Sequence, residues 1–365
     1  MKSLTLMLLL FLAPLLISAQ KRLPIIDMHL HAHSLDEYGG GGSVCTNDQK
    51  IEFPGVDPRL PITLDRVFSC PSPMKAAATD EAVMRESLAL LERYNIWAVT
   101  SGSLDRVSVW RASAPRRIIP AISFATSRSG PRTPVEFRRL FTEGRFIVFA
   151  EIGAQYQGLK LDDESYDPFF ALAEELDIPV GVHLGEGPPG GAHVMGGPTQ
   201  SAYRARLTSP FQVEEILVRH PRLRLYVMHY GSPLVDEMIA LLFSHPQVYV
   251  DIAQNDWGFP RAHFYSQLKR LIDAGFEKRI MWGSDQMIWP RTIEVAIKTI
   301  EDAPFLSREQ KRDIFYNNAA RFLRLNKEEI AKHHGRRTDT RHVGPNKRGQ
   351  RTGNRPVSSR QQAQR

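Results

Sequence analysis

Long apolar runs are scarce in this chain of 365 residues, and the one it has lies at the very start. Met1-Lys2 precedes an apolar run from Leu4 to Ile17, which ends in Ser18-Ala19. The run is short for a membrane-spanning helix and has the layout of a secretory signal peptide. We therefore expect residues 1–20 to be a signal peptide and the mature protein to be exported, to a periplasm or beyond. No later segment reaches spanning length, so we expect no stable membrane insertion.

Cysteine is also scarce, with only Cys45 and Cys70. Neither lies near the expected cleavage region, which excludes a lipid attachment site there. In an oxidising compartment the two can pair and close a loop of 26 residues. Pairing requires that their Cα atoms come within disulfide distance, and we treat it as a hypothesis.

Acidic residues are nearly absent from the C-terminal end. The segment from Gly335 to Arg365 holds nine Lys or Arg and one acid, so removing it changes the net charge from +7 to −1. It has no sustained apolar periodicity, and we expect residues 331–365 to be a disordered basic tail. The high isoelectric point belongs to this tail, so no specific nucleic-acid binding is expected of the folded part. A weak contact with a polyanion or a membrane surface is the alternative role of the tail.

Between these ends, residues 21–330 alternate short apolar strands with amphipathic helices. Eight strands are predicted, at 24–31, 96–100, 118–122, 146–152, 179–183, 223–229, 248–252 and 280–285. Near-continuous apolar strands separated by helices indicate a parallel sheet covered by helices, and eight such units are typical of a closed (β/α)8 barrel of the TIM type. A doubly wound open sheet is the second choice. No Gly-x-Gly-x-x-Gly follows the first strand, which argues against its dinucleotide-binding form.

Two segments rich in glycine and proline interrupt the pattern. Ser34–Thr79 follows the first strand and Gly185–Ser209 follows the fifth. Both leave the C-terminal ends of strands, where barrel sites lie, so both should form the rim of a site and set its substrate choice. Arg204 and Arg206 in the second insertion are candidates to hold an anionic substrate group. The alternative is that both are ordinary, solvent-exposed arginines of a loop.

Metal-ligand residue types recur at the ends of five predicted strands. The first strand ends in Asp27-Met28-His29-Leu30-His31, and alternation places Asp27, His29 and His31 on one face. The full set at strand ends is His29, His31, Glu151, His183, His229 and Asp285. Imidazoles and carboxylates suit zinc, iron or manganese, so the sequence predicts a site for a divalent metal at this end of the barrel.

The motifs at these strand ends resemble the amidohydrolase superfamily over residues 25–325. They are Asp-Met-His-Leu-His at 27–31, Ala-Glu-Ile-Gly at 150–153, Gly-Val-His at 181–183, Met-His-Tyr-Gly at 228–231, Trp-Gly-Ser-Asp at 282–285 and Tyr-Asn-Asn-Ala-Ala-Arg-Phe-Leu at 316–323. The pattern is most similar to the amidohydrolase-related (amidohydrolase 2) group, which contains metal-dependent hydrolases, lactonases and decarboxylases.

The resemblance implies a ligand set for one or two divalent ions, zinc being the expected metal. His29, His31 and Asp285 would bind a first ion. His183 and His229 would bind a second ion, or one of them would join the first ion while the other contacts substrate. Glu151 is similar to the bridging carboxylate of TatD-like deoxyribonucleases. No lysine stands at the end of the fourth strand, which departs from the lysine-bridged branch and leaves the number of ions open.

These residues predict a hydrolase that uses a metal-activated water on an amide, ester or lactone bond of a small molecule. Asp285 would accept the proton of that water and deliver it to the leaving group, with His229 as the second catalytic residue. Three alternatives stay open: a metal-dependent decarboxylase of the same group, a TatD-like phosphodiesterase, and a non-enzymatic binding protein on a retained barrel. Substrate identity and homo-oligomerisation are also open at this point.

Overall fold

The computed structural model describes residues 22–122, 133–194 and 202–335. The expected signal peptide and residues 336–365 of the expected tail lie outside these ranges. The chain divides into two compact units, residues 1–326 and 327–365. The described part of the second unit contains the helix α14 (Lys327–His333), whose last three residues are the first three of the expected tail.

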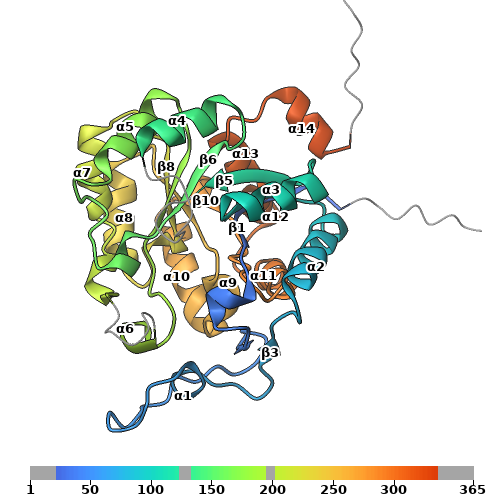
Figure 1. Ribbon diagram of the computed structural model, residues 1–365, viewed down its shortest axis with the longest axis vertical. Coiled ribbons are helices and arrows are strands. Elements are labelled where there is room, and N and C mark those ends of the chain that lie inside the picture. The colour runs from blue at the N-terminus through green and yellow to red at the C-terminus, as the bar shows by residue number, and fades with distance from the viewer. Residues whose placement is uncertain (1–21, 123–132, 195–201, 336–365) are drawn as a thin grey trace, which may run out of the picture. The chain divides into compact units, whose positions relative to one another are not determined.

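Eight parallel strands form the sheet of the first unit, each pairing with the next along the chain (Figure 1). In sheet order they are β1 (Ile25–Ala32), β4 (Ile96–Gly102), β5 (Ile118–Ile122), β6 (Val148–Ile152), β7 (Val180–His183), β8 (Leu225–Met228), β9 (Tyr249–Asp251) and β10 (Ile280–Met281). The sheet closes on itself, because Met28 N donates to Trp282 O at 3.0 Å and Asp285 N donates to His29 O at 2.6 Å. The predicted (β/α)8 barrel is confirmed.

Helices follow the strands and cover the outside of the barrel (Figure 1). They are α2 (Asp80–Arg93), α3 (Leu104–Ser113), α4 (Pro134–Thr142), α5 (Asp167–Glu175), α7 (Gln212–Arg219), α8 (Val235–Ser244), α10 (Arg261–Asp273) and α11 (Thr292–Glu301). Their starts follow local chemistry. The Thr79 side chain accepts a hydrogen bond from Ala82 N at the start of α2, and Thr133 and Glu136 form a capping box around Pro134 at the start of α4. No helix of the described residues is long and apolar enough to cross a membrane.

The core has an outer and an inner layer. The outer layer packs the helices on the sheet, and the inner layer fills the barrel with side chains such as Ile26, Met28, Val148 and Tyr226. Phe322 of α13 (Asn318–Phe322) belongs to this inner cluster. A barrel filled in this way is a rigid support, so the side chains at the strand ends are held in fixed positions.

The two predicted insertions leave the C-terminal ends of β1 and β7. The first carries η1 (Leu35–Tyr38), β2 (Ser43–Val44), α1 (Leu64–Val67) and β3 (Met74–Lys75), and the second carries α6 (Gly191–Val194) and η3 (Ala205–Thr208). In Figure 1, α1, β3 and α6 lie at the same end of the barrel. Cys45 and Cys70 form a disulfide with Cα atoms 5.8 Å apart, which confirms the hypothesis that they pair.

Candidate metal centre

Five of the six predicted ligands converge at the C-terminal end of the barrel. His29 and His31 come from β1, Glu151 from β6, and His229 and Asp285 from the residues after β8 and β10. Their ligand atoms form two overlapping groups, His29–Glu151–His229 and His29–His31–Asp285. Within each group, these atoms all lie within 4.8 Å of one another. Because His29 belongs to both groups, the arrangement defines one position centred on its imidazole.

Short distances join the two histidines of β1 to each other and to the two carboxylates. His29 Nε2 lies 3.1 Å from His31 Nε2, and Asp285 Oδ1 lies 3.0 Å from His31 Nε2. Glu151 Oε2 is 3.4 Å from His29 Nε2 and 3.3 Å from His31 Nε2. All five side chains belong to residues at most 7% exposed. Facing imidazole nitrogens beside two buried carboxylates is a costly arrangement unless a cation lies between them. The nitrogen and oxygen donors therefore fit a divalent cation such as zinc, manganese or iron.

Hydrogen bonds on the far side of each imidazole orient these histidines. His29 Nδ1 lies 3.2 Å from Asp251 Oδ2, His229 Nδ1 donates to Ala253 O at 2.9 Å, and His31 Nδ1 lies 3.0 Å from Ser101 Oγ. A proton held on Nδ1 by a carboxylate or carbonyl leaves the Nε2 lone pair facing the centre. These contacts fix the orientation of the His29 and His229 rings at the centre.

The electrostatics of the centre favour positive charge. Burial lowers the pKa of His29, but the carboxylates of Asp285 and Asp251 outweigh it and hold that pKa well above its usual value. Burial raises the pKa of Glu151, but His183 and His29 outweigh it and hold that pKa well below the usual range. Burial also raises the pKa of Asp285, but His29 and His31 outweigh it and lower that pKa. The carboxylates therefore stay charged and attract a cation.

Two of the converging residues have a left-handed backbone. His229 has φ of 58° and Asp285 has φ of 44°. Residues with a side chain rarely adopt this conformation, and it concentrates at functional sites. Here it turns the chain sharply after β8 and after the short β10. The strain is thus located where two ligand side chains enter the centre.

His183 lies beside the centre but outside both groups. Its Nε2 lies 2.6 Å from the Tyr156 hydroxyl and 3.6 Å from Glu151 Oε1. Burial lowers the pKa of His183 to about 3, so the ring is neutral. Its Nδ1 is buried and has no hydrogen-bond partner among the described residues. The role of His183 as a ligand stays a prediction.

Asp27 does not share the face of His29 and His31, so the alternation expected for this strand is wrong at that point. The register of β1 against β4 shifts between Asp27 and Leu30, as at a β-bulge. The Asp27 carboxylate instead accepts hydrogen bonds from Ser284 N and Ser284 Oγ, at 2.9 and 2.6 Å. It ties β1 to the segment that carries Asp285, which makes it a support of the centre.

Arg204 and Arg206 are exposed at η3 in the second insertion, and neither belongs to the metal-compatible groups. Their role in binding an anionic substrate group stays a prediction. Two contributors were missed from the sequence. Asp251 ends an apolar strand as the predicted ligands do, so the same criterion would have found it. Tyr156 follows β6 on the short helix η2 (Ala154–Gln157), and no motif in the sequence marks it.

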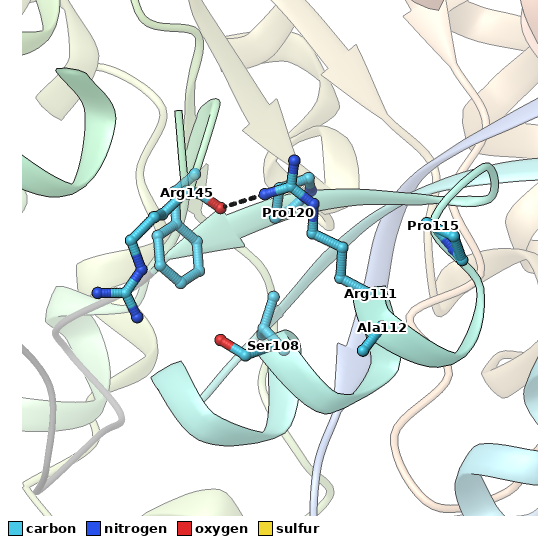
Figure 2. A pocket seen from close by; sticks show the side chains of 8 residues that line it. Ser108, Arg111, Ala112, Pro115, Pro120 and Arg145 are labelled. Atoms are coloured by element: carbon cyan, nitrogen blue, oxygen red, sulfur yellow. Dashed lines mark hydrogen bonds between the residues drawn. The ribbon is translucent and has the colours of Figure 1, made fainter. Parts of the chain in front are cut away.

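A hollow of about 320 Å³ beside the N-terminal ends of β5 and β6 is separate from this centre (Figure 2). No histidine, cysteine or acidic residue lines it. The guanidinium group of Arg111 donates to Gly144 O at 3.2 Å and to Arg145 O at 2.9 Å, the second of which is drawn in Figure 2. Because this guanidinium group is already hydrogen-bonded to backbone carbonyls, we interpret the hollow as a packing feature.

A filled (β/α)8 barrel with a histidine–carboxylate cluster at its C-terminal strand ends is the architecture of a metal-dependent enzyme. The amidohydrolase family model matches residues 26–325, and the chain belongs to this family. The resemblance of its motifs to the amidohydrolase superfamily is thereby confirmed. The match supports an enzyme of that superfamily. No curated protein matches the sequence.

Solved structures share the fold at low sequence identity. An uncharacterized TIM-barrel protein from Bordetella bronchiseptica is 16% identical with a TM-score of 0.54, covering 86% of this chain and 100% of its own. The 5-carboxyvanillate decarboxylase from Sphingomonas paucimobilis is 15% identical with a TM-score of 0.50, over 83% of this chain and 100% of its own. A dihydroxybenzoic acid decarboxylase from Polaromonas sp., solved with manganese and an inhibitor, is 15% identical with a TM-score of 0.50, over 84% of this chain and 99% of its own.

Proposed function

We propose that this protein is a metal-dependent hydrolase that cleaves an amide, ester or lactone bond of a small molecule. The observation that carries the proposal is the position of the Asp285 carboxylate, 3.0 Å from His31 Nε2 among the converging ligands. A carboxylate there can bind the cation and also reach a water molecule beside it. When bound, a divalent cation acts as a Lewis acid, which lowers the pKa of water and polarises a carbonyl oxygen.

The residues of the chain transfer the proton, hold the cation and orient its ligands. Asp285 accepts the proton of the attacking water and returns it to the leaving group. His229 Nδ1 donates to Ala253 O, which leaves Nε2 to bind the cation or to accept a proton. His29, His31 and Glu151 hold the cation, and Asp251 keeps the His29 ring in place. The imidazole and carboxylate donors support a divalent cation, and zinc is the metal we propose among the ions that suit them.

Export from the cytoplasm is part of the same proposal. The disulfide between Cys45 and Cys70 supports it, because structural disulfides persist in oxidising compartments. The N-terminal apolar run of the sequence supports it independently.

Decarboxylation of an aromatic acid is the second candidate. Two of the structures with a TM-score of 0.50 are decarboxylases of aromatic acids, and one of them binds manganese. The same cluster of ligands could hold a substrate carboxylate on the cation, so the residues of the centre serve either reaction.

A substrate panel with the metal-loaded full-length protein separates these reactions. The panel contains aryl esters, amides, lactones, a phosphodiester and aromatic carboxylic acids, and product acid and carbon dioxide are both measured. We expect release of product acid from an ester, amide or lactone, and loss of this activity after chelation. Carbon dioxide release without hydrolysis would favour the second candidate, and absence of any metal-dependent turnover would contradict both.

A further inference from the structure

A second hollow, of about 310 Å³, lies where the two insertions meet the segment between α9 (Asn255–Gly258) and α10. Phe53 of the first insertion, Phe259 and residues 186–193 and 203 of the second insertion line it. These segments follow the C-terminal ends of β1, β9 and β7, the end of the barrel that carries the metal ligands. Its volume lies at the lower end of the range for small-molecule sites.

The lining of this hollow, which we call the rim pocket, is apolar and aromatic. The ring of Phe53 packs 6.3 Å from Phe259 and 5.5 Å from Phe68, measured between ring centroids. The second insertion lines the pocket with the glycines and prolines of residues 187–191, which present backbone atoms and proline ring carbons to it. Such a surface favours a flat apolar group, because ring faces and edges pack against another aromatic ring.

Charge and hydrogen bonding in the rim pocket argue against an anionic guest. No lysine or arginine is among the residues that line it, and its ionisable side chains are Glu186, His193 and the phenol of Tyr203. Glu186 Oε1 accepts a hydrogen bond from Ser232 Oγ at 2.6 Å, and the Tyr203 hydroxyl donates to Glu186 O. The negative charge of Glu186 repels an anion and the Tyr203 hydroxyl already has a partner, so an uncharged ring suits the pocket better than a carboxylate or phosphate.

The position of Phe53 is held by local structure. Glu52 and Ser69 exchange two backbone hydrogen bonds of 2.9 and 3.0 Å, which places Phe53 beside Phe68. Cys70, the next residue after Ser69, is bonded to Cys45. Phe53 is 48% exposed, a high value for a phenylalanine held in this way. A large exposed ring on a supported loop is ready to pack against a ligand without reordering.

Two tyrosines in contact with each other lie between the rim pocket and the metal centre. Tyr203 lines the pocket, and its ring centroid is 6.1 Å from that of Tyr156. The Tyr156 hydroxyl in turn lies 2.6 Å from His183 Nε2. The second insertion also starts against the centre, because a Cβ added at Gly185 would lie 3.0 Å from the His229 side chain. The ring centroids of Tyr156 and His183 are 4.6 Å apart, so two ring contacts separate the rim pocket from the centre, a span that one small molecule can cover.

We propose that the rim pocket is a substrate subsite for an uncharged aromatic ring, with Phe53 and Phe259 as the residues that set this specificity. The inference rests on the proposed function, since it assigns the ring to a substrate whose scissile bond lies at the metal centre. The substrate class is then an ester, amide or lactone that carries an uncharged aromatic ring.

Two metal-chelating probes that differ by one aromatic group test the subsite. Naphthohydroxamic acid and acetohydroxamic acid share the chelating end, and calorimetry on the metal-loaded full-length protein gives both affinities. We expect the naphthyl probe to bind at least roughly tenfold more tightly than the acetyl probe. Phe53→Ala and Phe259→Ala should each lower this ratio severalfold and leave the affinity for acetohydroxamic acid unchanged. The matched control is Phe243→Ala on α8, a ring 84% exposed and outside the pocket, which should change neither affinity.

An unchanged affinity ratio in both pocket variants would overturn the subsite. If neither probe binds the metal-loaded protein, the metal centre and the proposed function fail, and the subsite is then measured directly. In that case naphthalene carboxamide, which needs no metal, is titrated against the metal-free protein by fluorescence. Binding that is lost in Phe53→Ala supports the subsite, and absence of binding to the unmodified protein overturns it.

Discussion

At the scale of the residue, the contact between His29 and Asp251 controls the geometry of the metal centre. The carboxylate lies 3.2 Å from His29 Nδ1, and its other oxygen accepts a hydrogen bond from His229 N at 2.8 Å. One buried side chain therefore orients two of the ligand-bearing segments. A carboxylate that contacts the second ring nitrogen of a metal-binding histidine commonly fixes the orientation of that ring.

Replacing Asp251 with asparagine should weaken metal binding and leave the fold intact. Asparagine keeps the shape but presents a neutral amide to His29, so the ring is held less firmly in the ligand tautomer. We expect a loss of about 10- to 100-fold in metal affinity, measured by competition with a chelating dye. Asp105→Asn, at an exposed position of α3, is the control and should bind metal as the unmodified protein does. Equal affinities in the two variants would contradict the assigned role.

Asp285→Asn should abolish most of the turnover. The amide cannot accept a proton from water, so kcat should fall by about 10²- to 10⁴-fold on whichever ester, amide or lactone the unmodified protein cleaves. The assay is run at saturating metal with the bound metal quantified, because the substitution also removes a ligand charge. A metal-loaded variant that retains near-normal kcat would disprove the role of Asp285 in proton transfer.

At this scale, the sequence predicted candidate ligands that end apolar strands, and the structure brings most of them together. His29, His31 and Asp285 could be predicted because the C-terminal ends of barrel strands meet at one face. The predicted face of Asp27 was wrong, because strict alternation does not anticipate a bulge that shifts the register of β1. Tyr156 could not be predicted either, because its contact with His183 depends on how η2 folds back over the barrel.

At the scale of the element, the first insertion depends on its disulfide. The bond between Cys45 and Cys70 closes a loop of 26 residues in a segment with little regular structure. Closing a loop of this length stabilises it by about 3 to 4 kcal/mol through the unfolded state. The barrel has its own core, so the insertion should loosen alone when the bond is reduced.

Limited trypsin digestion measures this local loosening. Reductant should speed cleavage at Lys50, Arg59 or Arg66 at least roughly tenfold, because the loop gains open conformations. The barrel helices should stay intact over the same time. The Cys45→Ser/Cys70→Ser double variant should be cleaved rapidly with or without reductant. Equal cleavage rates of the unmodified protein in both conditions would show that the disulfide does not order the insertion.

The π-helix η6 (Asp313–Asn317) next to β10 carries a buried acid that should make stability depend on pH. Burial raises the pKa of Asp313, but hydrogen bonds from Lys278 and Asn317 outweigh it and hold that pKa below its usual value of 3.8. A depressed folded-state pKa stabilises the protein above pH 3.8, and this contribution is lost as pH falls through the folded-state value. Acid should therefore weaken the attachment of η6.

Urea unfolding at pH 6 and pH 3 tests this attachment. Asp313→Asn should lower the free energy of unfolding at pH 6, and the difference from the unmodified protein should shrink at pH 3. Asp105→Asn on the surface of α3 serves as the control. A difference that is the same at both pH values would show that the charge of Asp313 is not what stabilises this element.

The elements themselves were largely predictable, and their ends were not. All eight strands occur where apolar runs predict them, since a parallel sheet buried on both faces needs continuous apolar residues. The last strand is shorter than predicted, ending at Met281, because the next backbone N–H, that of Trp282, donates to Ile314 O of η6 and not to a strand. The helical segment after α11 is α12 (Arg308–Arg312) followed by η6, a change of winding that apolar periodicity in the sequence does not distinguish.

At the scale of the whole molecule, metal binding and folding stability should be linked. The converging ligands come from β1, β6 and the segments after β8 and β10, so the cation binds the folded barrel and not the unfolded chain. Zinc at about 1,000 times its dissociation constant should add about 4 kcal/mol to the free energy of unfolding. Differential scanning calorimetry of the metal-free protein with added zinc measures the rise in Tm.

A variant without the central ligand provides the comparison. His29→Ala removes the residue shared by both ligand groups, so zinc should raise its Tm far less than that of the unmodified protein. An equal rise in both proteins would place the zinc elsewhere in the molecule.

Anomalous diffraction from crystals soaked in zinc or manganese tests the central claim most directly, because it locates the ion without requiring a substrate. We predict an anomalous peak about 2.0 to 2.3 Å from His29 Nε2 and His31 Nε2, with carboxylate oxygens of Asp285 or Glu151 at similar distances. Metal bound elsewhere, with no peak among these residues, would contradict the metal centre and the hydrolytic function built on it.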